Sequence, residues 1–81
     1  MALVLVAEDS ELIGDVYRDM LDTMGHTPII CTNGLKAVEA FKEQEPDMVL
    51  LDVKMPVMDG IEACKQIRSL PAGKNIPIII I

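Results

Sequence analysis

The chain has 81 residues, of which 51% are hydrophobic, and it carries a formal net charge of −6. A chain of this size and composition can build one small globular domain, so we expect residues 1–81 to form a single domain. The scattered lysines and arginines exclude a basic surface that could neutralise a phosphate backbone, and no direct nucleic-acid partner is expected. No apolar run approaches the roughly 20 residues of a membrane helix and no basic leader opens the chain, which predicts a cytoplasmic protein without membrane contact.

The first half of the chain alternates between strand and helix patterns. Residues 2–7 (ALVLVA) are apolar without polar alternation, as in a strand covered on both faces. A helix pattern begins after Ser10, a favourable N-cap residue, and ends at Gly25. Its apolar residues recur at helical spacing: Ile13, Val16, Tyr17, Met20, Leu21 and Met24. The next strand, residues 26–32 (HTPIICT), contains Pro28, which cannot donate a ladder hydrogen bond and therefore indicates a sheet edge.

The second half repeats this alternation. A helix pattern follows Gly34 and stops before Pro46. Its expected inward-facing residues are Leu35, Val38 and Phe41. Residues 48–52 (MVLLD) and residues 76–81 (IPIIII) are apolar strand candidates on either side of a third helix.

The third helix is predicted to begin at Asp59, which acts as a helix cap rather than as a ligand. Glu62 lies three residues further on, so that the pair resembles a capping box. The residues that this helix is expected to bury are Ile61, Cys64 and Ile67.

The element order β-α-β-α-β-α-β predicts an α/β fold with a parallel four-stranded sheet and three helices. Because parallel crossovers are right-handed, and because the second strand lies at an edge, the expected spatial order of the strands is 2-1-3-4. The first helix then lies on one face of the sheet and the other two helices lie on the opposite face.

Three acidic residues converge in this arrangement. Strands one and three are neighbours about 4.8 Å apart, so Glu8 and Asp9 after the first strand meet Asp52 at the end of the third. This edge is the topological switch point, where open α/β sheets bind ligands. Three carboxylates repel one another unless a cation joins them or some of them are protonated, and an all-oxygen site suits a hard cation such as Mg²⁺. Asp52 could then attack a phosphorus atom to form an aspartyl phosphate.

At this point the chain resembles a known family, the receiver domain of bacterial response regulators in two-component signalling, which includes the chemotaxis regulators. The resemblance covers the whole chain, and the segments that carry it are VLVAEDS, the Asn-Gly that opens the second helix, PDMVLLDVKMPVMDG and IPIIII. The most specific of them is the string D-x-x-M-P-x-x-D-G from Asp52 to Gly60, which follows an acidic pair. The resemblance implies a flavodoxin-like three-layer α/β/α fold.

The resemblance also implies a role for each site residue. Asp52 corresponds to the phosphoacceptor, which receives its phosphoryl group from a histidine kinase or a histidine phosphotransfer protein in a Mg²⁺-dependent reaction. Glu8, Asp9, Asp52 and the backbone carbonyl of Lys54 correspond to the metal ligands. The side chain of Lys54 occupies a position that influences dephosphorylation. A receiver of this kind is a signalling domain, not an enzyme beyond self-phosphorylation and dephosphorylation.

Some parts of the family pattern have no counterpart in the chain. In the family a Thr or Ser directly follows the fourth strand and a Lys precedes a Pro at the end of the fifth, whereas this sequence stops at Ile81. The expectation is a receiver domain truncated after its fourth strand, without switch and output elements. Strand 76–81, an uncharged edge, and the sheet face beside it would remain uncovered, which predicts a homodimer or a swapped oligomer.

Three other functions compete with this interpretation. A hydrolase of the haloacid dehalogenase type normally needs a second aspartate two residues after the nucleophile, where this chain has Lys54. A flavodoxin-like nucleotide binder needs a phosphate loop after the first strand, where Glu8 and Asp9 would repel phosphate. The third alternative is a non-signalling receiver fragment that acts only as a self-associating assembly module, and Mg²⁺-dependent phosphorylation would distinguish it.

The remaining reactive residues favour structural roles. Cys31 and Cys64 fit neither a zinc spacing nor a redox motif, and are expected to be small core residues of a reducing compartment. His26 directly follows the glycine that ends the first helix, which favours a solvated connector. Exposed acids on that helix could face a phosphotransfer helix, although a solvated face is favoured: Glu11, Asp15, Asp19 and Asp22.

Overall fold

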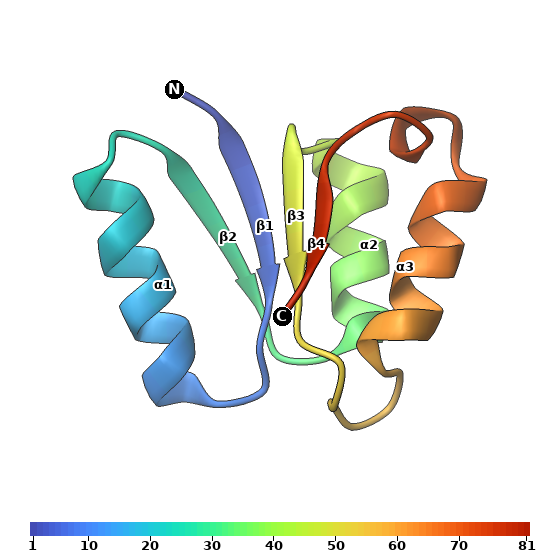
Figure 1. Cartoon of the computed structure of the whole chain (residues 1–81), viewed down its shortest axis with the longest axis horizontal. Coiled ribbons are helices and arrows are strands. Elements are labelled where there is room, and N and C mark those ends of the chain that lie inside the picture. Colours follow the sequence, from blue (N-terminus) through green and yellow to red (C-terminus); the bar gives the residue numbers. More distant parts are fainter.

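A computed structural model describes residues 1–81 and shows a parallel sheet with helices on both faces (Figure 1). The strands are β1 (Leu3–Ala7), β2 (Thr27–Cys31), β3 (Met48–Leu51) and β4 (Ile78–Ile80). Their order is β2-β1-β3-β4, and all three pairings are parallel. The predicted strand order is therefore confirmed, and the strand that contains Pro28 lies at an edge of the sheet.

The last strand is shorter than the predicted range 76–81. Only Ile78–Ile80 has strand geometry. Hydrogen bonds to β3 nevertheless extend one residue past each end, since the Val49 amide donates to the Pro77 carbonyl at 3.0 Å and the Ile81 amide donates to the Leu51 carbonyl at 2.8 Å. Pro77 can take this place because its carbonyl accepts while its missing N–H is not needed.

The helices are α1 (Glu11–Thr23), α2 (Gly34–Gln44) and α3 (Gly60–Ser69), followed by a short 3₁₀ turn, η1 (Pro71–Gly73). Figure 1 shows α1 on one face of the sheet and α2 and α3 on the other, as the crossovers predict. None of the helices combines the length and the apolar content needed to cross a membrane.

Each α-helix begins at a side-chain cap. The Ser10 hydroxyl accepts from the Ile13 amide at 3.3 Å, and the Asn33 side chain accepts from the Lys36 amide at 2.8 Å. The Asp59 carboxylate accepts from the Glu62 amide at 2.8 Å, which confirms Asp59 as a cap. These bonds satisfy amides that have no partner within the helix.

The predicted capping box of α3 forms only in part. The Asp59 amide donates no hydrogen bond to the Glu62 carboxylate, which accepts from the Gln66 side chain one turn further on, at 3.2 Å. The C-terminal end of α1 is followed by Gly25, which ends the helix as predicted. Gly25 has φ of +84°, the left-handed conformation that glycine adopts at low cost.

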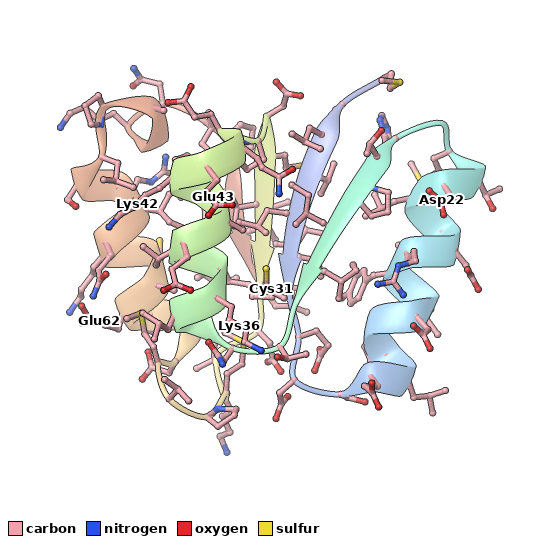
Figure 2. The ribbon with its side chains drawn as sticks, turned by 180° about the vertical axis from the view of Figure 1, so that it is seen from behind. Asp22, Cys31, Lys36, Lys42, Glu43 and Glu62 are labelled. Atoms are coloured by element: carbon pink, nitrogen blue, oxygen red, sulfur yellow. The ribbon has the colours of Figure 1, made fainter.

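The hydrophobic core is split between the two faces of the sheet. The larger part lies under α2 and α3 and centres on Phe41 and Ile67. The strand residues of this part alternate along β1 and β3 with residues that face the other side: Leu5, Ala7, Val49 and Leu51. Cys31, labelled in Figure 2, belongs to this part, and Cys64 packs against it, which confirms both cysteines as packing residues. The smaller part lies under α1 and contains Val4, Val6 and Leu21.

Several apolar helix residues are more exposed than their spacing predicts. On α1, Leu21 is buried, but four other members of the apolar pattern are exposed: Ile13, Val16, Met20 and Met24. The reason is that α1 packs mainly against β2 and β1, so that only a narrow part of its apolar face has a partner. The predicted apolar face of α1 therefore exists, but most of it is open.

Two predicted inward-facing residues on the other helices are also exposed. Leu35 is 41% exposed and Ile61 is 44% exposed, so both predictions are wrong. The buried face of α3 runs through Gly60, Ala63 and Ile67, and Ile61 lies beside that face. Likewise Leu35 lies at the margin of the buried face of α2, which is formed by Gly34, Ala37, Val38 and Phe41.

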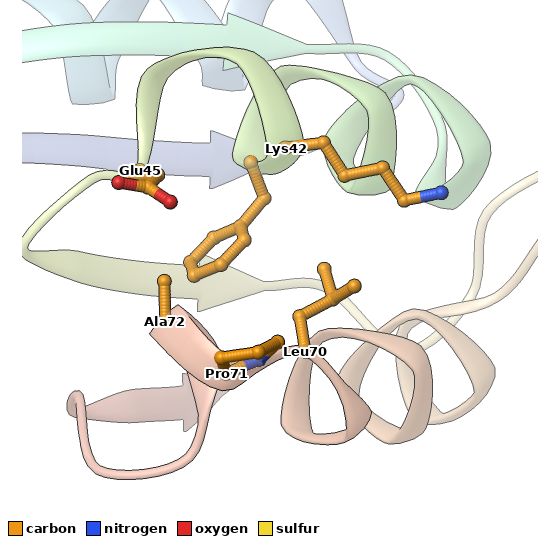
Figure 3. Close-up of a pocket in the computed structure, with 6 residues that line it drawn as sticks. Lys42, Glu45, Leu70, Pro71 and Ala72 are labelled. Carbon is orange, nitrogen blue, oxygen red and sulfur yellow. The ribbon is translucent and has the colours of Figure 1, made fainter.

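One small cavity lies between the end of α2 and η1 (Figure 3). Its volume is about 170 Å³, and it is lined by Phe41, Lys42, Glu45, Leu70, Pro71 and Ala72. The volume is below the about 300 Å³ at which ligand pockets usually begin. None of the three predicted acidic site residues lines this cavity.

Candidate functional site

The ends of β1 and β3 place two acidic residues side by side. Ala7, the last residue of β1, pairs with Leu51, the last residue of β3. The ladder continues beyond both strands, since the Asp52 amide donates to the Ala7 carbonyl at 3.0 Å and the Glu8 amide donates to the Cys31 carbonyl at 2.9 Å. The backbone of both acidic residues is therefore fixed by the sheet itself.

Three carboxylates meet at this edge. Glu8, Asp9 and Asp52 each present one oxygen, and these oxygens all lie within 4.8 Å of one another. Glu8 is only 7% exposed, whereas Asp52 is half-buried and Asp9 is exposed. The structure thus brings together the three acidic residues that the sequence predicts to converge. The site is buried at Glu8 and open to solvent at Asp9.

The environment of Glu8 disfavours its charged form. Burial raises the pKa of the Glu8 carboxyl group, the hydrogen bond from the Ser10 amide at 3.1 Å lowers it, and the negative charge of Asp52 raises it again, with a net upward shift. The direction shows that burial and the neighbouring negative charges outweigh the hydrogen bond that stabilises the ionised form.

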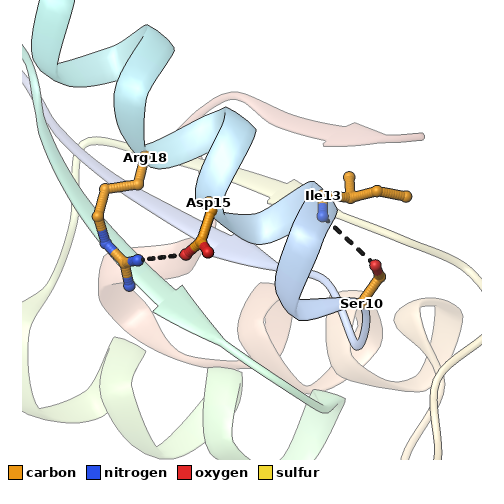
Figure 4. A network of polar contacts seen from close by, with 4 residues as sticks. All are labelled: Ser10, Ile13, Asp15 and Arg18. Carbon is orange, nitrogen blue, oxygen red and sulfur yellow. Dashed lines mark hydrogen bonds and ion pairs between the residues drawn. The ribbon is translucent and has the colours of Figure 1, made fainter.

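No basic side chain forms an ion pair with the site. The one salt bridge of the chain joins Arg18 and Asp15 at 2.8 Å on the exposed side of α1 (Figure 4). The donor set at the sheet edge therefore consists of oxygen atoms with excess negative charge. This composition fits a hard divalent cation such as Mg²⁺ and does not fit a soft metal that prefers sulfur or imidazole.

The loop after Asp52 carries Lys54, which lies two residues further along the chain. The side chain of Lys54 is exposed. The loop closes at its base, where the Gly60 amide donates to the Val53 carbonyl at 2.9 Å. Near its tip the Met58 amide donates to the Pro56 carbonyl at 2.7 Å, and Val57 between them has φ of +69°. Such a three-residue turn with positive φ is rare for a β-branched residue.

Sequence reasoning missed two contacts. The Ser10 amide donates to Glu8, a bond that the cap role of Ser10 does not reveal. His26 is half-buried, and its Nδ1 accepts from the Ala2 amide at 3.0 Å, so the prediction of a solvated connector is wrong. Its position directly before β2 and opposite the start of β1 was the available signal, because parallel neighbours begin at the same edge of a sheet.

The family model and the sequence relatives that match this chain all belong to one family. The model of the response regulator receiver domain matches residues 4–81. The chemotaxis protein CheY of Halobacterium salinarum is 40% identical over 73 residues, which are 90% of this chain and 61% of that protein. The polar-differentiation response regulator DivK of Brucella anthropi is 32% identical over 78 residues, which are 96% of this chain and 63% of that protein. The chain thus spans less than two thirds of the length of these relatives.

Solved structures agree with the sequence relatives. The N-terminal domain of a response regulator receiver protein from Methanoculleus marisnigri has a TM-score of 0.92 and 39% identity, and the match covers 99% of this chain and 65% of that one. The receiver domain of a sensor histidine kinase from Pseudomonas aeruginosa, solved with a magnesium ion coordinated in its active-site cleft, has a TM-score of 0.93 and 32% identity, with 98% and 65% covered. With its strand order, its acidic sheet edge and these relatives, the chain belongs to the family of response regulator receiver domains.

Proposed function

We propose that Asp52 is a phosphoacceptor that takes a phosphoryl group from a histidine kinase or a histidine phosphotransfer protein in a Mg²⁺-dependent reaction. The observation that carries this proposal is the convergence of three carboxylate oxygens within 4.8 Å at the ends of two adjacent strands, with no basic partner. Receiver domains are signalling modules, and this site gives the chain the parts of a phosphoacceptor. A cytoplasmic location is part of the same proposal.

The metal would be held by Glu8, Asp9 and Asp52, together with the backbone carbonyl of Lys54. Burial and the nearby negative charges together raise the pKa of Glu8, which supports this assignment, since a divalent cation would favour the ionised carboxylates. The magnesium ion in the active-site cleft of the related Pseudomonas receiver domain also supports it. When bound, Mg²⁺ supplies positive charge that neutralises the phosphoryl oxygens.

The proposed chemistry needs few groups from the protein. A carboxylate oxygen of Asp52 attacks the phosphorus of a phosphohistidine, and a P–O bond forms while the P–N bond breaks. The electron pair of the broken bond stays on the imidazole nitrogen, which takes its proton from solvent. Asp52 is suited to this step because it is half-buried, held by the hydrogen bond that its amide donates to the Ala7 carbonyl, and still reachable from outside.

We assign to Lys54 an influence on the half-life of the aspartyl phosphate. The exposed Lys54 side chain lies on the loop that directly follows Asp52, where it can influence the approach of water to an aspartyl phosphate. The reaction of the chain alone is then limited to self-phosphorylation from small donors and to slow dephosphorylation.

The test is a mass measurement after incubation with Mg²⁺ and a small acyl-phosphate donor. We expect the unmodified chain to gain the mass of one phosphoryl group, and Asp52→Asn to gain none. Asp59→Asn is the matched control, because it makes the same change in charge at the α3 cap and asparagine still caps a helix. Equal phosphorylation of Asp52→Asn, or no phosphorylation of the unmodified chain, would contradict the proposal.

We also propose that this 81-residue chain self-associates through β4. The strand lies at an edge of the sheet, residues 76–81 have no charged side chain, and Ile79 is 48% exposed. An uncharged edge strand with free backbone groups can pair with the same strand of a second copy around a two-fold axis. The exposed apolar residues of α1 and of β4 would lie close to such an interface: Ile13, Val16, Met20, Ile80 and Ile81.

A further inference from the structure

We propose that Gly34, the first residue of α2, is a positioning residue for the loop of residues 53–59 that follows the phosphoacceptor. This inference rests on the proposed function of Asp52. Gly34 lies far from Asp52 in the sequence and belongs to a different helix, yet it contacts the tip of this loop directly.

The base of the loop is fixed at Gly60. The Gly60 amide donates to the Val53 carbonyl at 2.9 Å, and a β-carbon at Gly60 would overlap the carbonyl oxygen of Asp52. The first residue of α3 therefore packs directly against the backbone of the phosphoacceptor. A shift of this loop is transmitted to Asp52 through backbone contacts rather than through flexible side chains.

The tip of the loop has an unusual conformation. Val57 has φ of +69° within the turn closed by the bond from Met58 to Pro56. A β-branched residue keeps such a conformation only where its surroundings impose it. The turn itself supplies one bond, so a contact from outside the loop is needed to hold the tip in place.

Gly34 supplies that contact. Its amide, one of those at the start of α2 without a partner in the helix, donates to the Met58 carbonyl at 2.9 Å. A β-carbon at Gly34 would overlap this same carbonyl oxygen and would lie 2.9 Å from the carbonyl oxygen of Asp59. Both obstructing atoms belong to the backbone, so a larger residue can be accommodated only if the loop moves. The start of α2 thus sets the position of the loop that carries Lys54.

The chain offers a matched control for a purely structural role. Gly73 also lies against backbone, since a β-carbon there would overlap the Ile67 carbonyl oxygen, and its amide donates to the Leu70 carbonyl at 3.0 Å. It is the last residue of η1, beyond the C-terminal end of α3 and away from the acidic site. Gly34→Ala and Gly73→Ala therefore impose similar steric conflicts, of which only the first affects the loop.

The experiment compares the Mg²⁺ affinity and the initial rate of phosphorylation per folded molecule in both variants. For Gly34→Ala we expect the rate to fall by about ten- to a hundredfold, because a small displacement of reacting groups has effects of this size. Its Mg²⁺ affinity should fall as well. For Gly73→Ala both quantities should match those of the unmodified chain. Unchanged values per folded molecule in Gly34→Ala would overturn the proposal.

A second measurement needs no variant, so it remains decisive if Gly34→Ala does not fold. In the unmodified chain, Mg²⁺ should slow hydrogen exchange at the Gly34 amide and leave the Gly73 amide unaffected. A Gly34 amide that does not respond to Mg²⁺ would contradict the coupling between α2 and the loop.

Failure of the proposed function would be recognised separately. If the unmodified chain binds Mg²⁺ but takes no phosphoryl group, the function of Asp52 is wrong, and affinity and exchange still decide the role of Gly34. If the unmodified chain binds no Mg²⁺, the NMR resonances of the Val53 and Lys54 amides decide the role of Gly34. They should shift in Gly34→Ala and stay in place in Gly73→Ala, and equal spectra would overturn the positioning role.

Discussion

The Glu8 carboxylate accepts a hydrogen bond from the Ser10 amide at 3.1 Å while it lies in the same cluster of carboxylates as Asp52. The first contact stabilises the charge on Glu8, whereas burial and the negative charge of Asp52 oppose it. The opposing influences are larger, because the pKa of Glu8 is raised. Glu8 therefore reduces the stability of the metal-free fold when it is ionised.

This balance predicts how stability changes with pH. A raised pKa in the folded state means that the contribution of Glu8 is fully present below the ordinary glutamate pKa and is lost as the pH rises through the folded-state value. The metal-free chain should therefore lose stability from this residue as the pH rises above about 4.5. Glu8→Gln should remove that part of the pH dependence and be more stable than the unmodified chain at neutral pH.

Urea unfolding at several pH values without metal measures this effect. Glu11→Gln is the control, because it removes the same charge from an exposed position in the first turn of α1. It should keep the loss of stability with rising pH that Glu8 causes, because Glu11 is exposed and does not belong to the cluster of carboxylates. Parallel pH profiles for Glu8→Gln and the unmodified chain would show that the direction assigned to Glu8 is wrong.

Mg²⁺ should stabilise the fold through the same cluster. A ligand that binds only the folded state at a hundred times its dissociation constant adds about 2.7 kcal/mol. Asp9→Asn should lose most of this gain, because it removes one of three converging carboxylates. Asp15→Asn should keep it, since Asp15 pairs with Arg18 outside the site. Thermal unfolding with and without Mg²⁺ makes the comparison, and an equal response of the two variants would argue against the site.

The strand order and the acidic cluster could be predicted because local patterns determine both. Apolar runs without alternation identify buried parallel strands, and the preferred handedness of crossovers then restricts the strand order. Once β1 and β3 are neighbours, residues that directly follow them must meet, as Glu8 and Asp52 do. Asp59 as a helix cap was predictable for the same reason, because a cap depends on three consecutive peptide units.

The features that could not be predicted depend on contacts between distant segments. The helical spacing of Leu35 and Ile61 shows which face of a helix is apolar, but not how much of that face another element covers. The conformation of Val57 likewise depends on the contact between Met58 and Gly34, which no turn motif encodes. Pro56 and the Asp59-Gly60 pair indicate a turn and leave its geometry open.

Arg68 should stabilise the segment that leads into β4. Its guanidinium group donates to the carbonyls of Gly73 at 3.0 Å, Lys74 at 3.3 Å and Ile76 at 2.8 Å. Because these bonds involve a charged donor but are partly exposed, we expect Arg68→Ala to lose about 1 kcal/mol of unfolding free energy. Hydrogen exchange in β4 should accelerate in parallel.

The control for Arg68 is the other arginine with a defined contact. Arg18 forms an exposed ion pair with Asp15 on α1, and such pairs contribute about 0.3–0.5 kcal/mol. Arg18→Ala should therefore cost less and should leave exchange in β4 unchanged. If both variants lose equal stability and neither affects β4, the contacts of Arg68 do not hold this segment.

Self-association through β4 predicts a specific effect of a charge in that strand. Ile79→Lys places an ammonium group on the exposed part of the edge, where pairing with a second copy would bury it next to its symmetry mate. Sedimentation should show a concentration-dependent dimer for the unmodified chain and a monomer for Ile79→Lys. Leu35→Lys introduces the same charge at an exposed apolar residue of α2, on the opposite face of the sheet from α1, and should leave the dimer intact. A monomeric unmodified chain, or dissociation by both substitutions alike, would show that β4 is not the interface, because a pairing strand must respond to its own charge and not to a distant one.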